Sequence, residues 1–395
     1  MGASDCSIDL RRSAGSEADE LTALCRLGGA GAEAGEQAAA AYRALAGALG
    51  VEGSSFADLA TETLFLRDVR RDLPAVLDAR ARVLGALGQA ERAPRPVCIG
   101  QAPLDEGAAL ELAASAVLPR HRRAAEVRDL ALEAGCACAG CVGSGARLVR
   151  VGARTVLHST NLYGTGGDVF EQALGMFRMA ERLLEACGMD FRDVVRTWIH
   201  LHDIDRDYDA LNAARREFFR QRGIALRPAS TGVGGTPFPG VHDCSLVLQA
   251  MRTDGPLEVV GMSTPSLNEA WSYGADFSRG LRLADPNRLT LLVSGTASID
   301  DAGRSVHPGD FEAQAERMLD NIASLLAGQG TDFTSIVSGT TYLKRPGDAS
   351  ALRAIYRRRG FAGFPAALVR ADLCRPELLC EAEAVAVLPA GSIRA

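Results

Sequence analysis

Residues 314–360 read "QAERMLDNIASLLAGQGTDFTSIVSGTTYLKRPGDASALRAIYRRRG". This stretch runs from an amphipathic segment that stops at a glycine, through a loop with a phenylalanine, to a β-branched segment, a charged turn and a second amphipathic segment. The apolar spacing of the two amphipathic segments predicts helices, and the β-branched segment predicts a strand. Residues 38–84 and 173–219 repeat this order. The chain therefore contains three copies of one unit.

Further strand-like segments surround each pair of helices. They precede the first helix at 20–29, 154–164 and 288–298, and they follow the second helix at 95–119, 227–251 and 364–389. Strands before, between and after two helices predict an α+β fold, in which one sheet is covered on one face by helices.

Three tandem domains follow from this repeat. We expect a degenerate unit at 1–120, a cysteine-containing linker at 121–147, a second unit at 148–253, and a third unit with the active site at 254–395. A chain of 395 residues is long enough for two or three cores.

The repeated unit resembles the Rid (YjgF-like) family. The resemblance rests on a "LFVSG"-type strand, a "DxxAQ" helix entry, a "YLKD"-type turn and a "LVEIEA"-type ending, found at 291–295, 310–314, 342–345 and 379–384. Members of this family are typically homotrimers with clefts between neighbouring sheets. The resemblance therefore implies that three units in one chain form an intramolecular pseudo-trimer. We expect a monomer, with further oligomerisation left open.

The Rid imine deaminases carry an arginine directly after a Pro-Ala pair in the penultimate strand, where it holds the substrate carboxylate. None of the three units has it. The corresponding positions read Pro365-Ala366-Ala367, Pro228-Ala229-Ser230 and Pro96-Val97. This departure disfavours the ordinary deaminase reaction.

The chain is also similar to the chorismatases, a branch with tandem Rid-like units. "PASTGVGG" (228–235) and "ALVRADLCRPELLCE" (367–381) carry this resemblance. It implies that Glu381 is the catalytic acid, and that Gly295 and Cys374 mark the type that forms 3-hydroxybenzoate. The implied reaction converts chorismate to 3-hydroxybenzoate and pyruvate without metal or organic cofactor, and the expected setting is secondary metabolism. The strand Arg196–His200 departs from the usual chorismatase pattern.

The residues around Glu381 are compatible with the role of a catalytic acid. Protonating an enol ether needs a carboxylic acid that stays protonated near pH 7, and burial beside Leu379 and Cys380 would raise the pKa of Glu381. Cys374 is either a nucleophile or a residue that shapes the pocket. A substrate with two carboxylates needs cationic anchors. The candidates are Arg375, Arg370, Arg227 and Arg353, with Tyr163 and Tyr342 as possible hydroxyl donors.

A purely structural role stays open for each of these residues. Glu381 can be a solvated glutamate on an outer sheet face, Cys374 a buried inert thiol, and each arginine a surface ion-pair residue. Two other functions also remain: a divergent Rid-type imine or enamine hydrolase, and a catalytically inactive ligand-binding protein. In the first unit Glu111 matches Glu381, but Leu104 stands in the place of Cys374.

The composition of the chain limits the classes of binding partner that we expect. The formal net charge of −6 offers no basis for binding nucleic acid or an anionic membrane, so a small anionic substrate is expected. The N-terminal residues lack the apolar core of a signal peptide, and the ten cysteines are expected to be reduced thiols in the cytoplasm. The Cys136, Cys138 and Cys141 cluster lacks a matching fourth ligand, so no metal is expected.

Overall fold

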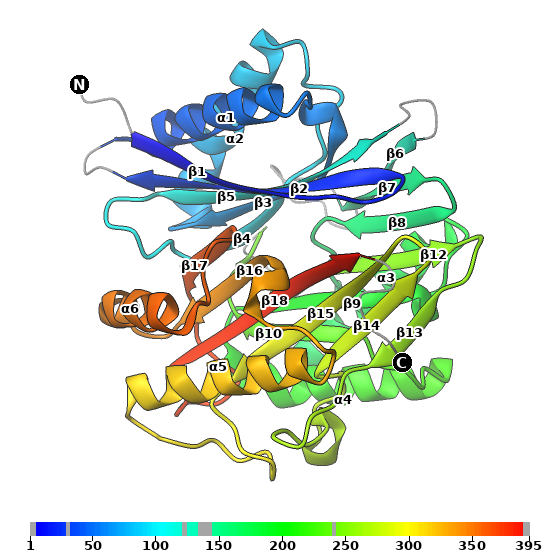
Figure 1. Cartoon of the computed structure of the whole chain (residues 1–395), viewed down its shortest axis with the longest axis vertical. Helices are drawn as coiled ribbons and strands as arrows, with labels where there is room; N and C mark the ends of the chain where they lie inside the picture. The colour runs from blue at the N-terminus through cyan, green and yellow to red at the C-terminus, as the bar shows by residue number, and fades with distance from the viewer. Residues whose placement is uncertain (1–4, 29–31, 121–124, 133–143, 239–241, 390–395) are drawn as a thin grey trace.

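The computed structural model describes residues 5–28, 32–120, 125–132, 144–238 and 242–389. These residues form three six-stranded sheets, and each sheet carries two helices on its outer face (Figure 1). The inner faces of the sheets pack toward one another. The expected α+β fold with three Rid-like units is confirmed.

The first unit builds the first sheet, in the order β1-β2-β5-β3-β4. Its elements are β1 (Asp5–Ser13), β2 (Ala18–Gly28), α1 (Ala34–Val51), β3 (Leu59–Leu66), α2 (Val69–Ala86), β4 (Val97–Gly100) and β5 (Leu110–Pro119). The sixth strand, β11 (Thr236–Pro237), comes from the second unit and pairs with β4.

The second unit builds a sheet in the order β6-β7-β8-β12-β9-β10. Its elements are β6 (Ala125–Ala131), β7 (Gly145–Val151), β8 (Arg154–Ser159), α3 (Val169–Glu185), β9 (Val194–Leu201), α4 (Ile204–Arg222), β10 (Ala229–Gly234) and β12 (Cys244–Thr253). β6 lies within the segment 121–147 that was expected to be a linker, and it pairs with β7 along its full length and extends this sheet at one edge.

The third unit repeats this plan in the order β13-β14-β15-β18-β16-β17. Its elements are β13 (Glu258–Gly261), β14 (Gly280–Asp285), β15 (Arg288–Ala297), α5 (Phe311–Ala327), β16 (Ile336–Leu343), α6 (Ala349–Arg359), β17 (Ala366–Arg370) and β18 (Cys380–Pro389). In every unit the last long strand lies between the strand that precedes the first helix and the strand that connects the two helices.

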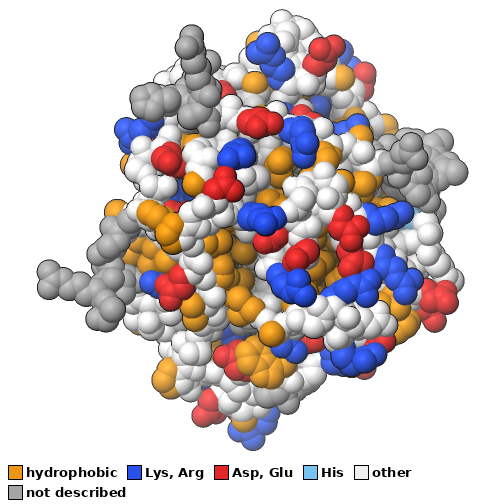
Figure 2. Space-filling model, turned by 90° about the vertical axis from the view of Figure 1, so that its right-hand side faces the viewer, with side chains coloured by type: hydrophobic (Ala, Val, Ile, Leu, Met, Phe, Trp, Pro, Cys, Tyr) orange, Lys and Arg blue, Asp and Glu red, His pale blue; other side chains and the backbone are white. Residues whose placement is uncertain are grey.

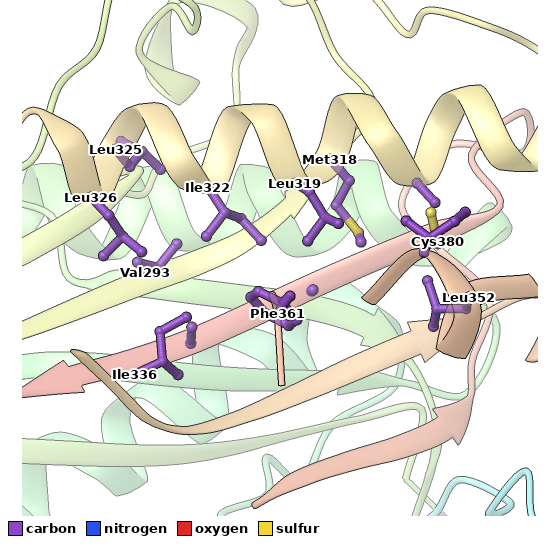
Figure 3. Close-up of a cluster of buried hydrophobic side chains, with 14 of the residues drawn as sticks. Val293, Met318, Leu319, Ile322, Leu325, Leu326, Ile336, Leu352, Phe361 and Cys380 are labelled. Atoms are coloured by element: carbon purple, nitrogen blue, oxygen red, sulfur yellow. The ribbon is translucent and has the colours of Figure 1, made fainter. Parts of the chain in front are cut away.

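Local sequence signals explain where the helices begin. Asp168 and Asp310 precede α3 and α5, and each side chain accepts a hydrogen bond from a backbone N–H three residues later. These caps satisfy donors that the first helical turn leaves open. The apolar faces of the helices then bury the outer face of the sheet. Figure 3 shows this for the third unit, where Met318, Leu319 and Ile322 of α5 pack over β18.

The alternation of side chains in β18 decides which residues face the interior. Cys380, Ala382 and Ala384 belong to the core beneath α5. Successive strand residues point to opposite faces, so Glu381 and Glu383 point to the inner face, toward the other units. This placement excludes the interpretation of Glu381 as a solvated residue on an outer face, since it is only 4% exposed.

The inner faces of the three sheets enclose a central cavity of about 310 Å³. At one end, Arg154 of the second unit and Arg288 of the third unit both form ion pairs with Glu20 of the first unit. Elsewhere a cluster of apolar residues that includes Phe65, Ile99, Val233, Tyr342 and Val369 joins the three units. The units therefore share one interior as well as having separate cores.

The outer surface mixes charges of both signs. Figure 2 shows one face, on which acidic and basic side chains lie interspersed with apolar ones. Within the described residues, no helix is both long enough and apolar enough to cross a membrane.

Candidate active site between the second and third units

Glu381 lies where the second and third units meet, a place that we call the second–third junction. Its Cα pairs with Tyr342 on one side and with Ala297 on the other. Burial raises the pKa of Glu381 to about 8, and the neighbouring carboxylate of Glu383 adds to the rise. At neutral pH this carboxyl group is therefore largely protonated, as a general acid requires.

Glu383 is held by three donors from the second unit. Arg196 Nη2 lies 2.5 Å from Oε2, Trp198 Nε1 donates to Oε1 at 2.8 Å, and the Thr231 hydroxyl donates to Oε2. The Arg196 guanidinium also lies 5.0 Å from the centre of the Trp198 ring. This network fixes a negative charge two residues from Glu381 on the same strand face.

Gly295 makes room for the acid. A Cβ at this position would lie 2.0 Å from Oε1 of Glu381, which no side chain can tolerate without displacing the carboxyl group. The backbone N–H of Gly295 donates to Thr231 Oγ1 at 3.0 Å, and the register between β15 and β18 shifts between Val293 and Thr296. The bulge and the missing side chain together place Glu381 against the second unit.

Cys374 lies within electrostatic reach of Glu381. It packs against the core of the second unit and against the shared apolar cluster. Burial raises the pKa of the thiol to about 12, and the charge of Glu381 raises it further, although Arg375 and a hydrogen bond with Tyr208 act in the opposite direction. A thiol that stays protonated is a weak nucleophile, so this setting suits a residue that shapes the pocket.

The four arginines expected as anchors do not converge on Glu381. Arg375 lies near Cys374, but it donates to the carbonyl of Gly303 at 2.7 Å and to Ser305. Arg227 pairs with Asp276 at 2.8 Å near the same junction. Arg353 pairs with Asp105 of the first unit, which places it at a different junction. Arg370 is exposed at the end of β17.

Two other buried arginines, Arg279 and Arg215, lie at the same junction. Arg279 donates to the carbonyl of Asn268 at 2.9 Å, and Arg215 donates to Asn212 Oδ1 at 2.6 Å. Arg279 and Arg215 are 3% and 4% exposed, and each guanidinium lies 5.7 Å from the centre of the Phe277 ring. The charge of Arg279 lowers the pKa of both Glu381 and Cys374, so it acts on both groups. Arg279 belongs to "FSRG" (277–280), and its charge at the start of a buried strand is the signal that could have identified it.

The two tyrosines that we expected as hydroxyl donors lie in different places. Tyr342 lies opposite Glu381 and is fully buried, and burial raises its pKa well above its usual value. Tyr163 is buried elsewhere, where its ring stacks on His242 at 4.7 Å. Tyr163 therefore does not belong to the site around Glu381.

Glu111 of the first unit lies at the matching position between the first and third units. It pairs with Phe65 as Glu381 pairs with Tyr342, and burial raises its pKa to about 8. Its Oε2 accepts a hydrogen bond from the backbone N–H of Leu368 at 3.2 Å, and Arg26 Nε lies 3.6 Å from Oε1. This carboxyl group is thus engaged by protein groups.

The described part of the chain contains no group of three or more His, Cys, Asp or Glu side chains arranged to hold a metal ion. The three cysteines at 136, 138 and 141 lie outside the described residues.

Comparisons with known proteins agree with this architecture. The chain is 28% identical over 229 residues to a 3-hydroxybenzoate synthase of Streptomyces hygroscopicus, over 51% of this chain and 65% of that protein, just under two thirds of its length. It is 24% identical to a chorismatase of the same organism, over 56% and 68%. It is also 34% identical over 77 residues to a 2-iminobutanoate/2-iminopropanoate deaminase of Capra hircus, over 20% and 56%.

A crystal structure of chorismatase superposes with a TM-score of 0.57 at 21% identity, covering 73% of this chain and 86% of that one, which shows the shared fold. The model of the family described as endoribonuclease L-PSP matches residues 141–241 and 273–388, which cover the larger part of the second and third units. The chain therefore belongs to the endoribonuclease L-PSP family, also known as the Rid family.

Proposed function

We propose that this protein is a chorismatase-like enzyme that converts chorismate to 3-hydroxybenzoate and pyruvate. The observation that carries the proposal is the Glu381 carboxyl group, which is buried, largely protonated at neutral pH, and set against the backbone of Gly295. The similarity to a 3-hydroxybenzoate synthase supports the choice of product.

In this mechanism Glu381 donates its proton to the methylene carbon of the enolpyruvyl group. Protonation makes the ether-bearing carbon electrophilic, so a water molecule adds to it and returns a proton to the Glu381 carboxylate. The bond between the side-chain carbon and the ring oxygen then breaks, which releases pyruvate and leaves a hydroxyl group on the ring. The ring loses its other hydroxyl group, together with the hydrogen on the carbon that bore the ether, as water and becomes aromatic. One water is consumed and one is released, so the two products together contain the same atoms as chorismate, and the reaction needs no oxidant or reductant.

The substrate carries two carboxylates, and the buried arginines at the second–third junction suit them. Arg279 and Arg215 flank Phe277 at the second–third junction, and a planar guanidinium can bind a carboxylate through two hydrogen bonds. Cys374 and Gly295 border the acid and set the shape of the space beside it. We assign the product specificity to these two residues.

The test measures pyruvate by a coupled assay and the aromatic product by chromatography after incubation with chorismate. Glu381→Gln should reduce pyruvate release by at least about a hundredfold, because general acid catalysis contributes about that much. Glu111→Gln is the matched control, since it alters the equivalent buried glutamate at a different junction, and it should keep the activity. Chorismate that stays intact with the wild-type protein refutes the proposal, as does a Glu381→Gln variant with wild-type rates.

The second candidate is hydrolysis of a small imine or enamine. The similarity to the deaminase of Capra hircus favours it. Against it, residue 367, which follows the Pro-Ala pair in β17, is an alanine buried in the shared apolar cluster. Release of ammonia from 2-iminopropanoate by the same protein, without pyruvate from chorismate, would select this function. Inactivity in both assays would select a role in ligand binding.

A further inference from the structure

The first–second junction, where the first and second units meet, carries a different chemistry from the site around Glu381. Ser245 holds in β12 the place that Glu381 holds in β18 and Glu111 in β5, and its partner across the ladder is His200. The neighbours of both residues, at 199, 201, 244 and 246, pack into the core beneath the helices. Ser245 and His200 therefore point inward, toward the first unit.

Four buried polar atoms at this junction have no hydrogen-bond partner among the described residues. They are Ser245 Oγ, His200 Nδ1, Asn161 Nδ2 and Gln101 Oε1. Each of these residues is at most 4% exposed. Native proteins pair nearly all buried polar groups, and each unpaired group opposes folding. Four such atoms at one junction indicate a place for a polar occupant.

Backbone pairing brings the four residues to the same junction. The Cys98 N–H donates to Asn161 Oδ1 at 2.9 Å, and Gln101 Nε2 donates to the carbonyl of Gly234 at 2.7 Å. Gly234 follows the β10 residue that pairs with His200. Asn161 directly precedes a residue that exchanges two backbone hydrogen bonds with the neighbour of Ser245. In Asn161 and Gln101, one polar atom is thus anchored, and the other remains for a ligand.

The unpaired atoms define the chemistry of the occupant. The Asn161 amide can only donate, the Gln101 oxygen can only accept, and Ser245 can do either. Burial lowers the pKa of His200 to about 4, so its ring is neutral at physiological pH. Of the four residues, His200 lines the central cavity, and the other three lie behind it, so an occupant reaches them from the cavity beside His200.

We propose that the first–second junction is a binding site for a small uncharged molecule that carries both a carbonyl group and a hydroxyl or amide group. Ser245, His200, Asn161 and Gln101 hold it from two units. None of these four side chains carries a charge, so a carboxylate bound directly to them would lack a counter-ion among them and would carry a desolvation cost. The site is independent of the reaction proposed at Glu381.

The probe is lactamide, which has a carbonyl, an amide and a hydroxyl group, and lactate is its charged counterpart. Titration followed by NMR and a crystal structure of the soaked full-length protein should show saturable binding of lactamide at Ser245 and Asn161. Ser245→Ala should weaken binding about five- to tenfold, which corresponds to the loss of one hydrogen bond. Ser115→Ala is the matched control, because Ser115 lines the central cavity as His200 does, but its hydroxyl is already paired with Thr61 at 2.6 Å.

Every outcome decides the proposal. Lactamide bound at the junction, weakened by Ser245→Ala and unchanged by Ser115→Ala, supports it. Ordered water alone at the four groups in the soaked crystal overturns it. Equal binding of lactate and lactamide overturns the uncharged class, and binding that Ser245→Ala leaves unchanged overturns the assignment of these residues.

Discussion

The charge of Glu383 gives the sharpest test of how the acid is tuned. Side chains two residues apart on one strand face are separated by roughly 7 Å. At an effective dielectric constant of about 20, two like charges at that distance repel by about 2 kcal/mol, or about 1.5 pKa units. Glu383→Gln should therefore lower the pKa of Glu381 from about 8 to roughly 6.5.

The direction of the pH dependence follows from the role of Glu381 as an acid. The rate of pyruvate release requires the protonated carboxyl group, so it is high below the pKa and falls as the pH rises through it. In Glu383→Gln this fall should move about 1.5 pH units toward acid. Arg196→Gln should move it toward alkaline pH, because the Arg196 charge lowers the pKa of Glu381. Trp198→Phe removes a hydrogen bond to Glu383 but no charge, and it should leave the midpoint nearly unchanged.

Two measurements separate the electrostatics from the reaction. The first is the pH profile of kcat with chorismate, and the second is an NMR titration of carbon-13-labelled glutamate in the free protein, assigned with Glu381→Gln. The titration applies even if chorismate is not the substrate. A midpoint that moves in the same direction in Glu383→Gln and Arg196→Gln, or that moves in neither, would refute the reasoning.

Three further predictions concern single residues. Gly295→Ala should abolish most activity while the fold persists, because its Cβ would lie 2.0 Å from Oε1 of Glu381; wild-type kinetics in this variant would contradict the geometry. The raised pKa of Glu111 means that its stabilising protonated form is fully present below its unfolded pKa and lost as the pH rises through about 8. Urea unfolding at pH 5 and pH 9 should accordingly show a smaller loss of stability for Glu111→Gln than for the wild type, and an equal loss would count against this prediction. Glu20→Gln should lower the free energy of unfolding by about 2–3 kcal/mol, since it leaves two largely buried arginines without their shared carboxylate. Glu258→Gln, which breaks the exposed pair with Arg282, is the control, and equal effects of the two substitutions would refute the role of Glu20.

The repeat in the sequence was enough to predict the three-unit fold, because helix and strand periodicity is a local property. The sequence could also predict that Glu381, Gly295, Cys374 and Tyr342 lie near one another, since all four belong to adjoining segments of one unit. The sequence did not predict that part of the segment 121–147 forms a strand. β6 becomes a strand only because an edge of the second sheet is available to pair with it.

The cationic side of the site was harder to predict, for a physical reason. Arg196, Thr231 and Trp198 reach Glu383 from another unit, across more than 150 residues of sequence. Spacing along one strand cannot show which inner face will lie opposite it. Arg227, Arg353 and Arg375 were plausible by position, and each is engaged by a nearby carboxylate or carbonyl group, as Arg279 is by the carbonyl of Asn268.

The single carboxylate of Glu20, shared by Arg154 and Arg288, has a consequence for how such a protein can change over time. A ring of three identical subunits must repeat every substitution three times, so one acid facing two bases cannot form at its axis. Fusion of the units into one polypeptide removes that constraint. Each boundary between neighbours then becomes free to vary alone, and one chain can keep an acid at one boundary while it places neutral groups at another.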